Sequence, residues 1–231
     1  MADLDGDGCN DLITGCYEGG SYVLRGTKGG GFEAPKPVLD KAGSVLRVGM
    51  FWDYETKKWS AVETPKYKES LGISAHAVDW DADGDFDLLL GTQEGKILLR
   101  INEGNAKTAA YTTESVEIEA QGAPLMAPGG HAMPFVVDWD GDGLWDLVTG
   151  GGAGGAVWYR NTGEKGKPTF AAAQVLVAPE ADGVGQRTQA CVADFDADGR
   201  MDLLLGDYRS EGRVYNGWVW LFRRAPPKGK P

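Results

Sequence analysis

The sequence DWDGDGLWD, from Asp138 to Asp146, decides the fold because the chain contains it in four related copies. The other three read DLDGDGCND, DWDADGDFD and DFDADGRMD, and they begin at Asp3, Asp79 and Asp194. All four copies have aspartate at positions 1, 3, 5 and 9 and glycine at position 6. Successive copies begin 76, 59 and 56 residues apart. A period near this length is typical of propellers and other arrays of one structural unit.

Each copy has the composition of a calcium-binding loop. Ca²⁺ takes roughly 6–8 oxygen ligands, which carboxylates and backbone carbonyls can share. Aspartates at positions 1, 3 and 5 turn three carboxylates inward, and glycine at position 6 permits a sharp reversal with positive φ. Position 7 can offer its backbone carbonyl, and the aspartate at position 9 closes the shell and begins the next strand. The predicted ligands of up to four Ca²⁺ ions are Asp3, Asp5, Asp7, Cys9 and Asp11; Asp79, Asp81, Asp83, Asp85 and Asp87; Asp138, Asp140, Asp142, Leu144 and Asp146; and Asp194, Asp196, Asp198, Arg200 and Asp202.

Two other interpretations fit the loops less well. An EF-hand shares the first six positions, but it requires glutamate at position 12 and flanking helices. Position 12 is Thr14, Leu90, Thr149 or Leu205, and the flanking residues have the composition of strands. A metal-free acidic turn is the second interpretation, since Asp and Gly both favour turns. Four copies that each crowd at least four carboxylates into nine residues speak against it, because unneutralised like charges repel.

Each loop lies at the same point of a longer unit of four short apolar segments. One segment precedes the loop, the second follows it and ends in glycine, the third opens with glycine, and the fourth begins at Phe32, Tyr111 or Phe170. Short segments rich in β-branched and aromatic residues and bounded by Gly, Pro or Asn are typical of antiparallel strands. The predicted fold class is therefore all-β, a β-propeller built of four-stranded antiparallel blades.

Four repeats are visible, and they leave the closure of the ring open. The units span about 1–41, 72–120, 130–178 and 187–222, with a predicted extra hairpin at about 42–71 and a tail at 223–231. Unit one lacks nearly all of the strand before its loop, and unit four stops after its third strand. The chain is therefore predicted to be either a partial propeller or a subunit that needs neighbours. Open ends would expose apolar faces and strand edges, which invite self-association.

The units resemble the FG-GAP (VCBS-type) repeats of integrin α-subunit heads and of many bacterial secreted proteins. The loops match the D-x-D-x-D-G-x-x-D pattern of that family at all four sites, and residues 31–35, GFEAP, resemble the segment that names it. The similarity covers residues 1–222. It implies that each loop joins the first two strands of a blade and binds Ca²⁺. It also implies an extracellular or cell-surface location, although the chain contains no signal peptide.

Charge and composition narrow the choice of partners. The formal net charge of −11 argues against a nucleic-acid partner. The four loops hold half of the 34 acidic residues, so the acidity reflects the predicted metal sites, and four bound Ca²⁺ would bring the net charge to about −3. No apolar run is long enough to span a membrane. The three cysteines have no metal-ligand spacing and are predicted to be small buried residues.

Aromatic residues at loop position 2 are predicted to pack between neighbouring blades. Trp80, Trp139 and Phe195 occupy this position, and Leu4 fills it in the first loop. Since side chains alternate along a strand, position 2 points away from the metal. Trp52 and Trp59 lie on the predicted extra hairpin, where they either stack on a sugar ring or partner chain or close the hairpin's own small core.

The sequence contains no hydrolase, metalloprotease, P-loop or dinucleotide fingerprint. The leading functional prediction is a non-catalytic, Ca²⁺-binding propeller module for adhesion or for interaction with a protein or glycan ligand. The alternative is a lectin-like carbohydrate-binding protein, or the propeller part of a polysaccharide lyase. A lyase needs a basic residue beside the acidic group of the sugar. Arg187 and His131, each seven residues before a loop, are the candidates for that role.

Overall fold

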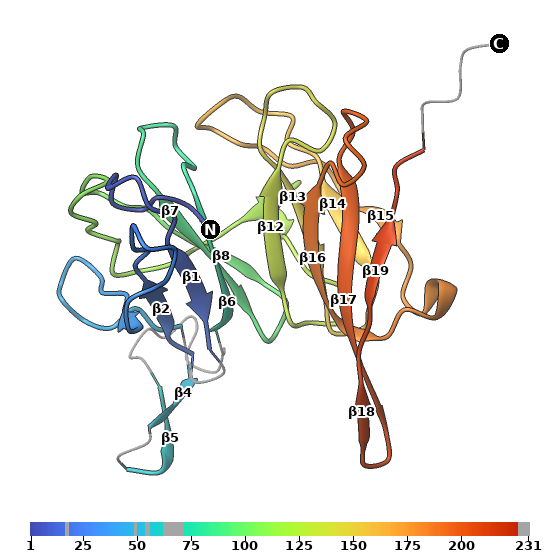
Figure 1. Cartoon of the computed structure of the whole chain (residues 1–231), viewed down its shortest axis with the longest axis horizontal. Helices are drawn as coiled ribbons and strands as arrows, with labels where there is room; N and C mark the ends of the chain where they lie inside the picture. The colour runs from blue at the N-terminus through green and yellow to red at the C-terminus, as the bar shows by residue number, and fades with distance from the viewer. Residues whose placement is uncertain (17–18, 49, 54–55, 62–71, 226–231) are drawn as a thin grey trace.

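The computed structural model describes residues 1–16, 19–48, 50–53, 56–61 and 72–225. Within these residues the fold is all-β, with four antiparallel sheets arranged side by side as the blades of a propeller (Figure 1). Blade one contains β1 (Leu12–Gly15), β2 (Ser21–Leu24) and β3 (Lys36–Pro37); blade two contains β6 (Gly72–Val78), β7 (Asp87–Thr92), β8 (Ile97–Arg100) and β9 (Val116–Glu117). Blade three contains β12 (Met133–Val137), β13 (Asp146–Gly150), β14 (Ala156–Tyr159) and β15 (Gln174–Val177); blade four contains β16 (Gln186–Ala193), β17 (Asp202–Glu211), β18 (Val214–Asn216) and β19 (Val219–Phe222).

The remaining elements are short additions to the blades. The strands β4 (Met50–Asp53) and β5 (Lys58–Ala61) pair as a separate hairpin, and β10 (Glu119–Ala120) pairs with β11 (Ala123–Pro124). A single 3₁₀ turn, η1 (Ala181–Gly183), precedes blade four. In blade four, β17 pairs with β16 and β19 along its first half, and its second half continues into a hairpin with β18. Figure 1 shows this hairpin and the β4–β5 hairpin protruding from the same end of the molecule.

Along the second strand of a blade, alternate residues pack against two different neighbouring blades. In β7, Leu88 and Leu90 join the apolar cluster with blade one, whereas Leu89 joins the cluster with blade three. In β13, Leu147 packs toward blade two and Val148 toward blade four. The second strand is therefore apolar on both faces because it lies between two blades. This explains why the runs after the acidic loops are continuously apolar instead of alternating with polar residues.

The glycine that ends the apolar run of each second strand permits close contact between blades. A Cβ atom built on Gly91 would lie 2.0 Å from the Ala132 carbonyl oxygen, and one on Gly150 would lie 2.2 Å from the Thr188 carbonyl oxygen. Both oxygens belong to the chain at the first strand of the following blade. At Gly206, the equivalent position of blade four, no atom lies within 4 Å of such a Cβ.

Blade four presents an uncovered apolar face. Val219 and Phe195 are 72% and 59% exposed, and Leu221 is 38% exposed. Leu221 pairs with Leu204 of β17, whose counterpart Val148 is fully buried against the following blade. No described residue covers this face of blade four.

Two burial predictions are wrong in part. Leu4 and Trp139 are buried and Trp80 packs against the core between blades two and three, but Phe195 is exposed because no described blade follows it. The cysteines are also not buried. Cys9 and Cys16 are half-buried, Cys191 is exposed, and all three are free thiols. Cys191 pairs with Leu204 across β16 and β17, so it lies on the same uncovered face.

Candidate functional site

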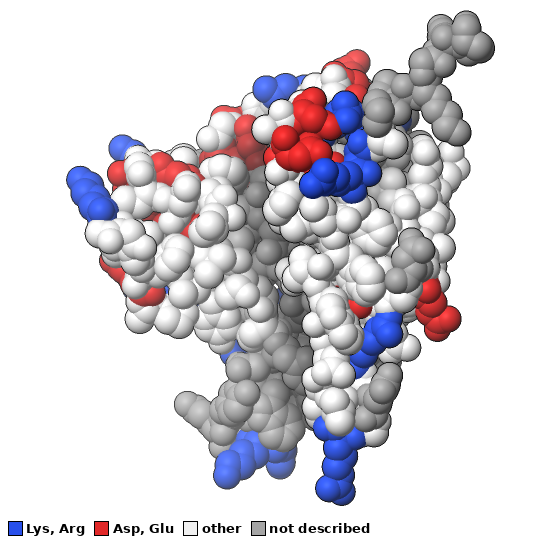
Figure 2. All heavy atoms as spheres, turned by 45° about the vertical axis from the view of Figure 1, so that its right-hand side comes forward, with Lys and Arg blue, Asp and Glu red and all other residues white. Residues whose placement is uncertain are grey.

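The four acidic loops lie at the same end of the blades, each directly before a second strand (Figure 1). We name them loop one (3–11), loop two (79–87), loop three (138–146) and loop four (194–202). Figure 2 shows acidic side chains gathered along this upper edge and basic side chains at the tips of the opposite end. In each loop, three carboxylates offer oxygen atoms that lie within 4.8 Å of one another. They belong to positions 1, 3 and 9 in loops one, three and four, and to positions 1, 3 and 5 in loop two.

The loop backbone reverses twice in the left-handed region. Glycine at position 6 has a φ of 88° at Gly8, 98° at Gly84 and similar values in the other two loops, as the pattern predicts. Position 4 is left-handed as well, and there it is occupied by alanine in two loops, Ala82 (φ 63°) and Ala197 (φ 57°). The sequence signal for this second reversal is the restriction of position 4 to Gly or Ala.

These reversals direct backbone N–H groups toward the aspartates. In loop three, the amides of Asp142 and Gly143 donate to the two oxygens of Asp138 at 3.0 and 2.9 Å. Loops one and four repeat this pair of hydrogen bonds. In all four loops the position-5 carboxylate accepts from the position-7 amide, as in the 3.0 Å bond from Leu144 N to Asp142. The loops are therefore preshaped by their own carboxylates.

The aspartate at position 9 is a buried anchor. Asp146 is fully buried, and its two oxygens accept the amides of Trp139 at 3.2 Å and Asn161 at 2.7 Å. The other three loops repeat this pair of hydrogen bonds. One donor is the amide at loop position 2, and the other is the amide two residues after the strand that pairs next to the second strand. The corresponding acceptors are Asp11, Asp87 and Asp202. This aspartate ties the loop, the second strand and the end of the third strand together.

Arginine side chains enter three of the loops. Arg25 Nη1 lies 2.6 Å from Asp11 and 3.4 Å from Asp5 in loop one. Arg160 pairs with the position-3 and position-5 carboxylates of loop three, at 2.6 and 3.0 Å. Sequence reasoning missed these residues and Arg223, which lies 3.7 Å from Asp196 in loop four. The available signal was an arginine directly after the third strand in three of the four units.

Loop two differs from the others in charge and in hydrogen bonding. Its position 7 is a fifth aspartate, Asp85, which is only 4% exposed and whose Oδ1 has no hydrogen-bond partner. Burial and the charges of Asp83, Asp81 and Asp79 raise the pKa of Asp85. Burial also raises the pKa of Asp87 to about 6. In loop one, by contrast, the Gly26 amide and the Arg25 guanidinium outweigh burial and hold the pKa of Asp11 below its ordinary value.

The candidates for sugar chemistry lie at the opposite end of the blades. Both His131 and Arg187 have positive φ, at 51° and 50°. Burial and the charge of Arg187 lower the pKa of His131. The guanidinium of Arg187 lies over the ring of Tyr208, 5.4 Å from its centroid. Tyr208 also lines a cleft of about 360 Å³ on blade four, together with the end of η1, the start of β16 and neighbouring residues near the end of β17.

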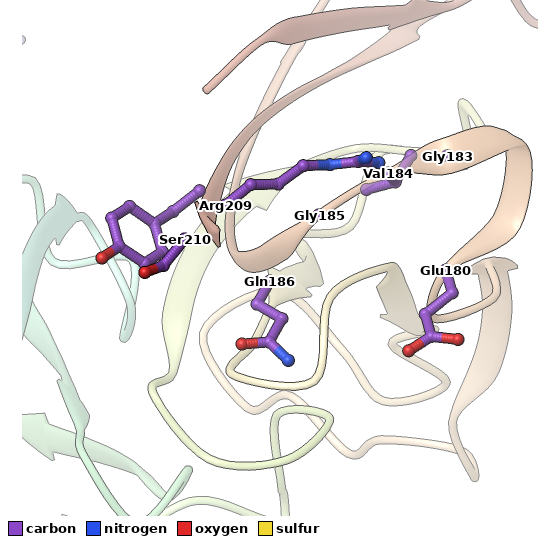
Figure 3. Close-up of a pocket in the computed structure, with 8 residues that line it drawn as sticks. Glu180, Gly183, Val184, Gly185, Gln186, Arg209 and Ser210 are labelled. Carbon is purple, nitrogen blue, oxygen red and sulfur yellow. The ribbon is translucent and has the colours of Figure 1, made fainter. Parts of the chain in front are cut away.

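Arg209 extends along this cleft (Figure 3). Its side chain reaches toward Gly183 and Val184, while Gln186 and Glu180 point away from it. The guanidinium also lies 5.6 Å from the ring centroid of Trp218. Asp207 fixes the cleft wall, because its carboxylate accepts from the amides of Gly185 and Trp218 and from the indole of Trp220. The cleft therefore combines an arginine, a tyrosine and polar groups on a rigid support.

The described part of the chain holds no helix that could cross a bilayer. A comparison with curated proteins returns no matching sequence. A scan against family models matches residues 138–205 to the FG-GAP-like repeat. That match begins at loop three and ends in β17, so it spans one complete blade-to-blade junction with its two acidic loops. The chain thus carries an FG-GAP-like repeat within a β-propeller arrangement of four blades, as its repeated loops predict.

Proposed function

We propose that the chain is a Ca²⁺-binding β-propeller module that acts by binding a ligand and not by catalysis. The observation that carries the proposal is the convergence of three carboxylates in every acidic loop. Asp79, Asp81 and Asp83 would hold one ion in loop two, and the aspartates at positions 1, 3 and 9 would hold ions in the other three loops. The oxygen-only donor set fits a hard cation of the size of Ca²⁺.

Bound Ca²⁺ would neutralise the repulsion between loop carboxylates and so stiffen one end of the propeller. A module of this kind suits the outside of the cell, where Ca²⁺ is abundant enough to fill sites that are exposed and only partly shielded. Adhesion or scaffolding through a protein or glycan ligand is the role that we infer from this combination. The uncovered face of blade four supports a second copy of the chain as a partner.

Calcium dependence is tested by thermal melting. A ligand that binds only the folded state stabilises it by about 2.7 kcal/mol per site at 100 times its dissociation constant. The melting temperature should therefore rise by several degrees in Ca²⁺ relative to excess EGTA, and Mg²⁺ should restore little of the difference, since it demands tighter octahedral geometry. Equal melting temperatures in Ca²⁺ and EGTA would contradict the proposal.

The cleft on blade four favours a second candidate function, the binding of an anionic glycan. Arg209 and Arg187 are not within 4 Å of any carboxylate in the described salt bridges, in contrast to the arginines of the loops. Tyr208 offers a ring for stacking on a sugar. A glycan array tests binding, and absorbance of unsaturated uronides tests cleavage. Binding that is lost in Arg209→Gln without any cleavage supports a lectin-like role, and cleavage that is lost in His131→Gln supports a lyase.

A further inference from the structure

Strand register shows which residues are equivalent in the four blades. The first apolar residue of each second strand pairs with Leu24, Arg100, Tyr159 or Phe222 of the third strand. The next residue along the chain is the one beside the acidic loop. It is an arginine in three blades, Arg25, Arg160 and Arg223, and it is Ile101 in blade two. The single exception belongs to the loop with the largest number of carboxylates.

The three arginines contact oxygens of the carboxylate clusters themselves. Arg25 reaches the carboxylates at positions 3 and 9 of loop one, and Arg160 reaches those at positions 3 and 5 of loop three. Arg223 is more exposed and reaches position 3 of loop four from 3.7 Å. Each guanidinium therefore neutralises part of the charge that a cation would neutralise.

Loop two has no such contact in the described residues. Ile101 packs against the apolar core between blades two and three. Arg100, one residue earlier, is buried and donates to Ser115 Oγ at 2.7 Å and to the Thr112 carbonyl. The position-1 carboxylate of loop two also accepts fewer and longer hydrogen bonds from the loop backbone. Asp79 accepts a single loop amide at 3.4 Å, whereas Asp138 accepts three at 2.8–3.0 Å.

We propose that the four loops bind divalent cations unequally, with loop two as the high-affinity site and Arg25, Arg160 and Arg223 as resident counter-ions that weaken the other three. The inference rests on the proposed function, since it concerns the same loops. A guanidinium and a cation cannot both take the same carboxylate oxygens at close range. Binding to loops one and three must therefore move the arginine aside or place the cation beside a positive charge.

The number of carboxylates, and whether an arginine already pairs with them, sets the expected order of cation affinity among the loops. Calcium affinity in oxygen sites follows the number of charged ligands and the rigidity of the site. Loop two has five carboxylates and no arginine contact among the described residues, whereas loops one and three have four carboxylates and one closely paired arginine. Loop four belongs with the weaker sites, because Arg200 pairs with its Asp198 in addition to the longer contact of Arg223 with Asp196.

Terbium luminescence can assign the first site to be filled. Tb³⁺ replaces Ca²⁺ in oxygen sites, and its emission is excited by a nearby indole. Loop two contains Trp80 and loop three contains Trp139 and Trp145, whereas loops one and four contain no tryptophan. Trp80 and Trp145 line one cleft between loops two and three, so carboxylate variants make the assignment. In a titration of the metal-free full chain, the first phase of emission should disappear in Asp81→Asn, and it should persist in Asp140→Asn.

Reciprocal substitutions test the role of the arginines by calorimetric titration with Ca²⁺ alone. Arg160→Gln should strengthen loop three by roughly tenfold, as expected when one positive charge is removed beside the carboxylates. Ile101→Arg should weaken loop two by a similar factor. Arg213→Gln removes one charge from the far end of blade four, between β17 and β18, and should change neither affinity.

The possible results separate this inference from the proposed function. A high-affinity phase assigned to loop two, together with stronger binding in Arg160→Gln, supports the inference. Four sites of one affinity, or an Arg160→Gln chain that binds Ca²⁺ as the wild type does, would overturn it and leave the calcium module intact. No Tb³⁺ or Ca²⁺ binding in any loop would overturn both. Because Arg160 is a partly exposed residue, its substitution remains informative even if Ile101→Arg does not fold.

Discussion

Two kinds of aspartate occupy the acidic loops, and they are expected to respond differently to substitution. The position-9 aspartates are buried and accept two backbone amides each, so their role in the fold does not depend on metal. The aspartates at positions 1, 3 and 5 are more exposed and mainly shape the loop. The distinction is invisible in the sequence, where all four positions carry the same residue.

Asp146→Asn is expected to destabilise the chain even in excess EDTA. The amide group would face one of two buried backbone N–H groups and leave it without an acceptor, which costs about 1–3 kcal/mol. Asp142→Asn in the same loop should change the free energy of unfolding much less, because Asp142 is partly exposed to water. Urea denaturation of both variants in EDTA measures the difference, and equal losses would contradict the anchoring role of position 9.

His76 is expected to make stability fall at mildly acidic pH. Burial lowers its pKa to about 4, and its Nε2 accepts the amide of Val136 at 3.4 Å in the neutral form. The unfolded chain, with an ordinary pKa near 6.5, binds more protons between these two values. The stability is therefore fully present above pH 6.5 and is lost as the pH falls toward 4, by up to about 3 kcal/mol.

The measurement for His76 is the difference between wild type and His76→Gln in urea denaturation at pH 7 and pH 4.5. Taking the difference removes the contribution of the aspartates, which titrate in the same range. The wild type should lose more stability than the variant on acidification. Parallel curves for the two proteins would show that His76 does not couple folding to protons.

At the scale of the strands, glycine marks the points where one blade crosses the next. The short apolar runs that follow the loops end in glycine because the first strand of the following blade passes within contact distance of the backbone. The sequence shows the glycine in all four units, but only three of them meet a following blade. The fourth provides a natural control within the same chain.

Gly150→Ala is expected to destabilise the chain strongly, and Gly206→Ala is expected to be nearly neutral. A methyl group at Gly150 would lie 2.2 Å from the Thr188 carbonyl oxygen, so blades three and four must separate. Overpacking of this kind typically costs about 1–3 kcal/mol. At Gly206 no atom lies within 4 Å. Thermal melts of the two variants decide the matter, and a similar loss at both positions would mean that a contact covers Gly206.

The strand arrangement could be predicted from the sequence because the repeats reinforce one another. Four copies of one loop fix the register of the segments around it, and the continuous apolar second strand follows from burial on both faces. Two features of the site could not be obtained in this way. The arginine contacts depend on which side of a strand a residue faces, and a one-residue offset separates Arg100 from the arginines that reach a loop. The exposure of Phe195 depends on the presence of a following blade, which no local pattern specifies.

At the scale of the whole molecule, the blades form a series with two unlike ends. Among the described residues, blades two and three are covered on both faces, and blade four is covered on one face only. Its open face carries the apolar residues whose counterparts in blade three are packed. Exposed apolar surface of this kind favours association.

The chain is expected to self-associate through blade four. Phe195→Asp and Leu221→Asp place charges on the uncovered face and should shift sedimentation at micromolar concentration toward the monomer. Val116→Asp is the matched control, since Val116 is 62% exposed on the outer strand of blade two. A wild-type chain that sediments as a single monomer over the whole concentration range would contradict the expectation.

The packing of each second strand between two blades has a consequence for how the molecule comes apart. Every blade exchanges stabilising contacts only with the blade before it and the blade after it, so the fold behaves as a one-dimensional chain of coupled units. The amides of β7 and β13, which have partners on both sides, should exchange their hydrogens slowest. The amides of β17 and β19 should exchange sooner, by opening of blade four alone. A cation held in loop two would then reinforce the stretch that opens last.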